Sequence, residues 1–136
     1  MAAERKTPTL ADGTELAFAL SLPADFNPEA SYPALLVLPG GGQSIEDATR
    51  QVEGFWQTEA AGRGYLVFAP GAPWGRPFFG DFADDELLPL FMNAMREQFH
   101  VEGGRFHLAG YSNGAESAFR VAVRRPTRRH DESAHS

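Results

Sequence analysis

Three uninterrupted apolar runs divide the chain. They are ALLVLP at Ala34–Pro39, YLVFAP at Tyr65–Pro70 and RFHLAG at Arg105–Gly110. A continuous apolar run of this length is typical of a strand that is buried on both faces. Such strands occur mainly in parallel sheets that carry helices on each side. The three runs therefore predict a mostly parallel sheet flanked by helices.

The segment between the first two runs has the periodicity of an amphipathic helix. Ser44 is followed three residues later by Asp47, which is the spacing of a capping box with Ser44 as the N-cap. Apolar residues then recur at steps of three and four and form one stripe: Ile45, Ala48, Val52, Phe55 and Trp56. Gly62 and Gly64 predict the end of this helix, because glycine favours the left-handed conformation found at helix C-termini.

Two further helices are expected. The first begins near Asp84 or Asp85, and its buried side comprises Leu87, Leu88, Phe91, Met95 and Phe99. Pro89 is expected in its first turn, because a proline deeper in a helix kinks it. The second follows Ser112 and ends at Pro126, and its sheet-facing side comprises Ala115, Ala118, Phe119, Ala122 and Val123.

The N-terminal segment predicts a β-hairpin at a sheet edge. Asp12-Gly13 supplies the positive φ angles of a tight turn, and Leu16, Phe18 and Leu20 fall on one face of the strand that follows. The order is then hairpin followed by alternating strands and helices, which indicates an α/β domain with right-handed crossovers. We expect this domain over residues 1–125 and a polar, disordered tail over residues 126–136.

Composition narrows the class of protein. The 136 residues carry a net charge of -6, and five arginines follow residue 119. An acidic body argues against nucleic-acid binding, and the arginine-rich end is interpreted as a solvated terminus rather than an anion-binding tail. There is no cysteine, so disulfides and thiolate metal sites are excluded. The sequence has neither a signal-peptide pattern nor a run of about 18 apolar residues, so we expect a cytoplasmic protein that does not bind membranes.

One motif carries candidate chemistry. GYSNG at Gly110–Gly114 matches G-x-S-x-G, and it follows a predicted strand and opens a predicted helix. That setting is the one in which a sharp turn presents a nucleophilic serine, here Ser112. Gly110 and Gly114 leave room where strand and helix approach each other. The alternative is an ordinary strand-to-helix turn in which the serine only caps the helix.

A second glycine motif follows the first apolar run. LPGGGQ covers Leu38–Gln43. Acyl transfer creates an oxyanion, which two backbone N–H groups can stabilise: that of Asn113, directly after the serine, and that of Gly41 or Gly42. The three glycines could instead serve only to turn the chain. No Lys-Ser/Thr follows them, which argues against a P-loop.

Together these motifs resemble a known family. YPALLVLPGGGQ, GYLVFAPGAPW and GGRFHLAGYSNGAESAFRVA are similar to the N-terminal half of an α/β-hydrolase, most of all to the esterase and polyhydroxyalkanoate-depolymerase-like branch of serine hydrolases. The resemblance runs from Tyr32 to about Arg124. It implies that Ser112 is the nucleophile and that Asn113 and the Gly41–Gly42 segment form the oxyanion hole. Many relatives carry histidine before the glycines, where this chain has Pro39.

Serine hydrolases of this family use a catalytic triad of serine, acid and histidine, and the sequence does not identify the acid or the histidine. In this fold they follow the serine, and only 24 residues follow Ser112. His107 lies in a predicted strand, where we expect it to pack or form a hydrogen bond, and His100 lies at a helix end. His130 and His135 lie in the polar tail, which lacks an apolar anchor to hold a general base in place. We therefore interpret the chain as a truncated hydrolase or a fragment of a longer one.

Truncation has a predicted structural consequence. In the resembled fold the strand at Arg105–Gly110 is central and pairs with a strand that this sequence does not provide. We expect it to form an open apolar edge, which favours self-association, and a homodimer across that edge is one possible arrangement.

The loop after the second apolar run suggests a substrate pocket. Trp74, Phe78, Phe79 and Phe82 cluster there, and they either line an acyl or alcohol pocket or cover the core. Asp81, Asp84 and Asp85 are interpreted as helix-capping residues rather than metal ligands. We infer no metal and no cofactor. The leading hypothesis is a carboxylic ester hydrolase acting on a small-molecule ester. The alternatives are an inactive remnant, which includes a binding or assembly module, and a peptidase on the same scaffold.

Overall fold

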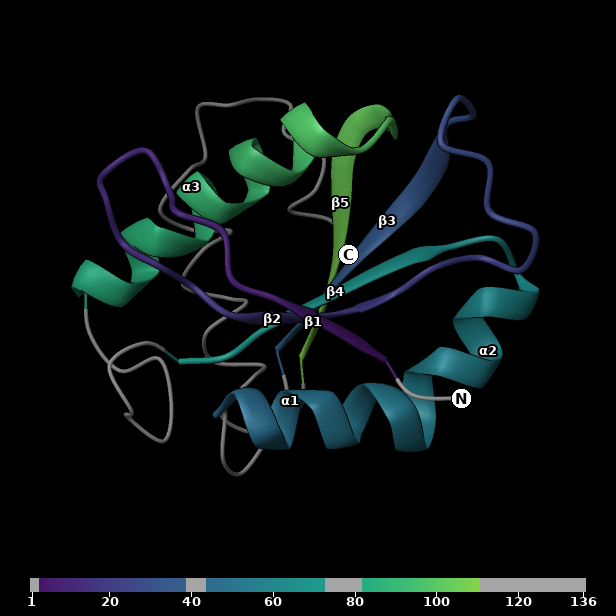
Figure 1. Cartoon of the computed structure of the whole chain (residues 1–136), viewed down its shortest axis with the longest axis horizontal. Coiled ribbons are helices and arrows are strands. Elements are labelled where there is room, and N and C mark those ends of the chain that lie inside the picture. The colour runs from purple at the N-terminus through teal and green to yellow at the C-terminus, as the bar shows by residue number, and fades with distance from the viewer. Residues whose placement is uncertain (1–2, 39–43, 73–81, 111–136) are drawn as a thin grey trace.

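Five strands form one mixed sheet in the order β1-β2-β4-β3-β5 (Figure 1). The structure is a computed structural model that describes residues 3–38, 44–72 and 82–110. The strands are β1 (Glu4–Lys6), β2 (Phe18–Ser21), β3 (Tyr32–Leu38), β4 (Leu66–Pro70) and β5 (Val101–Gly110). The three predicted strands correspond to β3, β4 and β5.

The pairing directions separate the sheet into two parts. β3 pairs in parallel with β4 on one side and with β5 on the other, whereas β2 pairs antiparallel with β4 and β1 with β2. Parallel pairing brings the carboxyl ends of β3, β4 and β5 to one edge of the sheet. At that edge Leu38 is the register partner of Gly110.

The predicted N-terminal hairpin is confirmed. Gly13 adopts a φ of 91°, its N–H donates to the Leu10 carbonyl at 2.9 Å, and the Thr14 N–H donates to the Asp12 carboxylate at 2.9 Å. Leu16, Phe18 and Leu20 are buried, as their common face predicted. β1 forms one end of the sheet and β2 joins the hairpin to β4.

One face of the sheet is covered by a helix that changes type along its length. The helix runs through α1 (Ile45–Gln51), a π-helical turn η1 (Val52–Trp56) and α2 (Gln57–Gly62). It ends where predicted, because the Tyr65 N–H donates to the Ala60 carbonyl at 3.0 Å and Gly64 has a φ of 80°. The π-helical turn was not predicted. Small side chains lie beneath the helix on the sheet: Ala19, Val37, Val67 and Ala69.

The opposite face is covered by α3 (Phe82–Gln98) and is aromatic (Figure 1). The predicted stripe is confirmed, since Leu87, Leu88, Phe91 and Met95 are buried and the partly buried Phe99 packs against this core. The predicted start and the place of Pro89 are wrong. α3 begins at Phe82, so Phe82 is helical rather than part of the aromatic loop, and the buried Pro89 lies inside the helix. A proline removes one helix hydrogen bond, and the packing of its neighbours outweighs that loss.

The expectation that β5 is buried on both faces is also wrong. Phe106 is its only buried residue, and among the described strands β5 pairs with β3 alone. The strand starts at Val101 rather than Arg105, and it bulges at Gly103 and Gly104, whose φ angles are 66° and 68°. β5 therefore lies at an edge of the described sheet, which agrees with the predicted edge position.

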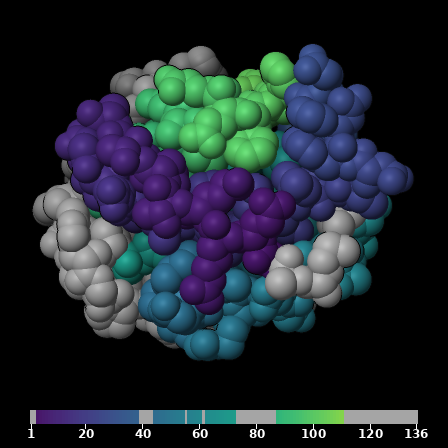
Figure 2. Space-filling view, in the orientation of Figure 1, coloured from purple at the N-terminus to yellow at the C-terminus, as the bar shows by residue number. Residues whose placement is uncertain are grey.

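The space-filling view shows how the layers close around the sheet. In Figure 2 the N-terminal segment (purple) lies between α3 (green) and the helices of the other face (teal). The predicted helix over residues 112–125 and the tail over residues 126–136 lie outside the described residues. None of the helices within the described ranges is long and apolar enough to cross a membrane.

Replacing Gly71 with alanine should destabilise the fold. A Cβ at Gly71 would lie 2.5 Å from the backbone nitrogen of Ile45 and 2.6 Å from its Cα, so the start of α1 would have to move. We expect Gly71→Ala to lower the free energy of unfolding by about 1–3 kcal/mol, measured by urea denaturation.

Gly54→Ala is the matched control for that substitution. A Cβ at Gly54 meets nothing within 4 Å, and alanine is a better helix former, so stability should be unchanged or higher by up to about 1 kcal/mol. A Gly71→Ala variant as stable as the parent would contradict the close approach of β4 and α1.

Candidate functional site

The candidate site is the edge of the sheet at the carboxyl ends of the parallel strands. The residues predicted for it lie outside the described residues: Ser112, Asn113, Gly41, Gly42, Trp74, Phe78 and Phe79. The structure fixes the strand ends from which those segments leave. Leu38 and Gly110 are register partners on neighbouring strands, so residues 39 and 111 each follow one member of an adjacent pair. Ligands bind outside the carboxyl ends of the strands in open α/β sheets.

The start of α1 is held by its predicted cap. The Asp47 N–H donates to Ser44 Oγ at 3.1 Å, and Ser44 Oγ donates to the Asp47 carboxylate at 3.0 Å. Asp47 also forms an ion pair with Arg50 on the next turn. Glu46 and Asp47 place negative charge in the first helical turn, which the helix dipole favours. The glycine segment 39–43 therefore spans from the end of a buried strand to a capped helix start.

The two histidines in the described residues lie away from this edge. His107 is the register partner of Leu35 and lies three residues before the end of β5. His107 is exposed, and its ring makes an edge-to-face contact with Tyr65, with ring centres 6.1 Å apart, so the prediction that it packs within the strand holds for this one contact only. His100 follows α3, and its carbonyl accepts a hydrogen bond from the Tyr32 N–H at 3.0 Å. His130 and His135 lie outside the described residues.

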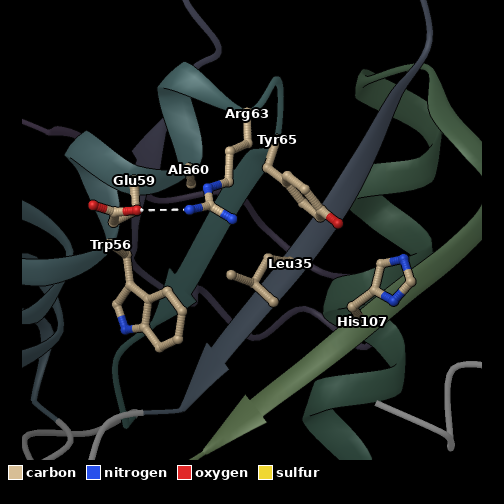
Figure 3. Close-up of a pocket in the computed structure, with 7 residues that line it drawn as sticks. All are labelled: Leu35, Trp56, Glu59, Ala60, Arg63, Tyr65 and His107. Atoms are coloured by element: carbon tan, nitrogen blue, oxygen red, sulfur yellow. Dashed lines mark hydrogen bonds and ion pairs between the residues drawn. The ribbon is translucent and has the colours of Figure 1, made fainter.

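A hollow of about 430 Å³ lies between α2 and the sheet (Figure 3). It is lined by Leu35, Trp56, Glu59, Ala60, Arg63, Tyr65 and His107. Arg63 and Glu59 form an ion pair of 3.2 Å at its rim. Its described lining holds aromatic and apolar surface and no serine, threonine or cysteine, so it offers a binding surface rather than a nucleophile. No local pattern in the sequence predicts this hollow, because its lining comes from three separate segments: Leu35, residues 56–65 and His107.

The described residues offer no metal site. Among them, no group of three or more histidine, aspartate or glutamate side chains is close enough to hold a metal ion. The backbone of Asp84 and Asp85 belongs to α3, two and three residues after its start at Phe82. Asp81 lies outside the described residues.

Proteins of known sequence or structure share parts of this architecture. No protein-family model matches the chain. Dipeptidyl-peptidase 5 of Porphyromonas gingivalis is 27% identical over 137 aligned residues, which cover 90% of this chain and 19% of the relative. A thermostable esterase of known structure superposes with a TM-score of 0.70 and 18% identity, over 92% of this chain and 38% of the esterase. The dipeptidyl peptidase 4 structure from P. gingivalis gives a TM-score of 0.68 and 19% identity, over 90% and 19%.

The chain carries part of the α/β-hydrolase fold. It spans about a fifth of the length of the curated relative and well under half of the esterase. The solved structures that share this part of the fold include both esterases and dipeptidyl peptidases. The expectation of a partial α/β-hydrolase fold is confirmed.

The cap at Ser44 should contribute measurably to this part of the α/β-hydrolase fold. Ser44→Ala removes the acceptor for the Asp47 N–H, and loss of an N-cap typically costs about 1 kcal/mol. We expect a loss of that size in the free energy of unfolding, measured by urea denaturation. Ser44→Asp keeps an acceptor and should retain more of the parent stability than Ser44→Ala. Equal stability of the two variants would contradict the capping role.

Proposed function

We propose that this chain is the nucleophile-bearing part of a serine-dependent carboxylic ester hydrolase. The observation that carries the proposal is the position of GYSNG at the end of β5, whose last residue is Gly110 and which pairs in parallel with β3. A G-x-S-x-G motif at the end of a parallel strand is the setting in which α/β-hydrolases present a nucleophile. Similarity to an esterase structure supports the same reaction class.

In this proposal Ser112 Oγ attacks the ester carbonyl carbon. The new C–O bond gives a tetrahedral intermediate whose oxyanion accepts hydrogen bonds from the backbone N–H groups of Asn113 and of Gly41 or Gly42. The intermediate then collapses, the C–O bond to the alcohol breaks, and the alcohol leaves with the proton that Ser112 released. Water hydrolyses the acyl-serine in a second addition and collapse. Each oxyanion donor contributes about 2.7–4 kcal/mol to lowering the barrier in enzymes of this kind.

The aromatic residues Trp74, Phe78 and Phe79 are the proposed lining for the acyl or alcohol group. They belong to the segment after β4, whose carboxyl end lies at the same edge of the sheet as that of β3. A small apolar ester is therefore the proposed substrate.

A second candidate is an inactive hydrolase fragment. It is favoured by one observation: neither histidine among the described residues lies at the carboxyl edge. A serine without a positioned base reacts slowly, and oxyanion stabilisation with binding alone accelerates hydrolysis by about 10³–10⁴-fold over water. Peptidase activity is a further candidate, supported by the similarity to dipeptidyl-peptidase 5.

Labelling with a fluorophosphonate probe tests the nucleophile. We expect the parent chain to be labelled and Ser112→Ala to lose the label, because the probe phosphonylates an activated serine. Ser31→Ala removes an exposed serine between β2 and β3 and should be labelled like the parent. Equal labelling of Ser112→Ala and the parent would rule out the assignment, and an unlabelled folded parent would favour the inactive fragment.

The rate of substrate hydrolysis distinguishes an esterase from a peptidase. Hydrolysis of p-nitrophenyl acetate that depends on Ser112 and exceeds the rate in water supports the esterase. Cleavage of a dipeptidyl p-nitroanilide in preference to the ester would instead support the peptidase.

A further inference from the structure

The strand that leads to the serine motif does not pair evenly with β3. Between the pairs that Val101 and Phe106 form with β3, β5 advances five residues while β3 advances two. The extra residues form the bulge at Gly103 and Gly104, whose φ angles of 66° and 68° lie in the left-handed region. That conformation is unfavourable for residues with a side chain, so the two glycines allow the bulge to form.

Arg96, in the last turn of α3, contacts this bulge. Its Nε donates a hydrogen bond to the Gly104 carbonyl at 2.5 Å, and its Nη1 donates to the side-chain oxygen of Asn93 at 2.7 Å. The central carbon of the guanidinium also lies 5.2 Å from the centre of the Phe106 ring. Phe106 is the first residue of regular pairing after the bulge. One planar group therefore joins the end of α3 to the bulge and to the strand that follows it.

The length of the bulge sets the register of the rest of β5. Beyond the bulge the pairing continues without a further shift to Gly110, which lies opposite Leu38. One residue more or fewer in the bulge would move Gly110 along β3 by about 3.3 Å. Because GYSNG begins at Gly110, the bulge determines the level at which this motif leaves the sheet.

Burial alone does not fix this register. Phe106 and Leu108 belong to the aromatic core, and His107 lies on the side of α2. A slip of one residue would exchange the two sides, so packing opposes it. A slip of two residues keeps the sides and would bring Leu108 opposite Leu38, a displacement of about 6.6 Å.

The contacts of Arg96 distinguish the observed register from a slip of two residues. Closing the bulge by two residues would draw Gly104 into the ladder opposite Ala34 and would move its carbonyl away from the end of α3. The charge-assisted hydrogen bond from Arg96 would be lost, and so would the contact with the Phe106 ring. The hydrogen bond is exposed, but it has only to favour one of two registers that bury the same face.

We propose that Arg96 is a positioning residue that fixes the register of β5 against β3. It acts through the backbone of β5 and holds the start of GYSNG level with the end of β3. The effect on reactivity rests on the proposed ester hydrolase, in which the register decides where Ser112 lies at the edge of the sheet. A misplacement of about 1 Å can slow an enzyme reaction by about 10²-fold, and a slip of two residues is larger.

Arg96→Met keeps an apolar side chain over the Phe106 ring and removes the guanidinium. We expect backbone NOEs of this variant to show a second register, with contacts of Leu38 to Leu108 in place of those to Gly110. Fluorophosphonate labelling per folded molecule should be about tenfold slower than in the parent, or slower still. A loss of stability alone would lower the folded fraction and leave the register of the folded molecules unchanged.

Three further variants complete the test. Arg96→Lys keeps a donor for the Gly104 carbonyl and should restore part of the parent register. Asn93→Ala removes the acceptor that orients the guanidinium, so it should shift the register in the same direction but less, and it decides the case if Arg96→Met does not fold. Arg5→Met removes an exposed arginine from β1 and should change neither register nor labelling.

The NOEs decide this proposal separately from the proposed function. The parent register in folded Arg96→Met, or in Asn93→Ala where Arg96→Met does not fold, would overturn it, as would an equal shift in Arg5→Met. A parent chain that the probe does not label would count against the esterase, and the register in the variants would still test the role of Arg96.

Discussion

The parallel pairing of β3 with both of its neighbours is the constraint on which the rest of the structure depends. β3 pairs with β4 on one side and β5 on the other, and its residues from Leu36 to Leu38 are buried. Because all three strands run the same way, their carboxyl ends meet at one edge. Residues that follow these strands, including the glycine segment after Leu38 and the serine motif after β5, therefore leave the sheet from neighbouring positions. Without this register nothing would indicate that the two motifs begin at neighbouring positions of the sheet.

The two faces of the sheet are packed with side chains of different size. On the α3 face the ring of Phe68 lies 5.4–6.3 Å from the rings of Phe18, Phe91, Phe99 and Phe106, so large interlocking side chains fill a thick layer. On the other face alanine and valine predominate, and the helix approaches closely enough that Gly71 has no room for a Cβ beside Ile45. This close approach holds the capped start of α1 against the carboxyl end of β4. The face with small side chains thus brings the N-terminus of α1 to the edge of the sheet at which the reaction of Ser112 is proposed.

Local signals in the sequence were sufficient for much of this fold. The apolar runs located β3 and β4, Ser44 and Asp47 located the start of α1, and Gly64 located the end of α2, because each feature is decided by a few adjacent residues. Pro89 was misplaced because tertiary packing overrides its local cost. The exposure of β5 could not be seen either, since an apolar run does not reveal how many neighbours its strand has. The hollow between α2 and the sheet depends on residues from distant segments, and its lining is set by topology rather than by any local motif.

The register of β5 against β3 also determines the position of His107 and the face of the sheet to which it belongs. Side chains alternate along a strand, so Phe106 and Leu108 face the aromatic core while His107 and Ala109 belong to the opposite face. Moving His107 to the end of β5 would require a slip of three residues, and an odd slip exchanges the faces of the whole strand. Phe106 would then leave the core and the bulge at Gly103 and Gly104 would lose its register. With the observed pairing His107 therefore stays three residues before the end of β5, away from the edge at which the proposed reaction of Ser112 would take place.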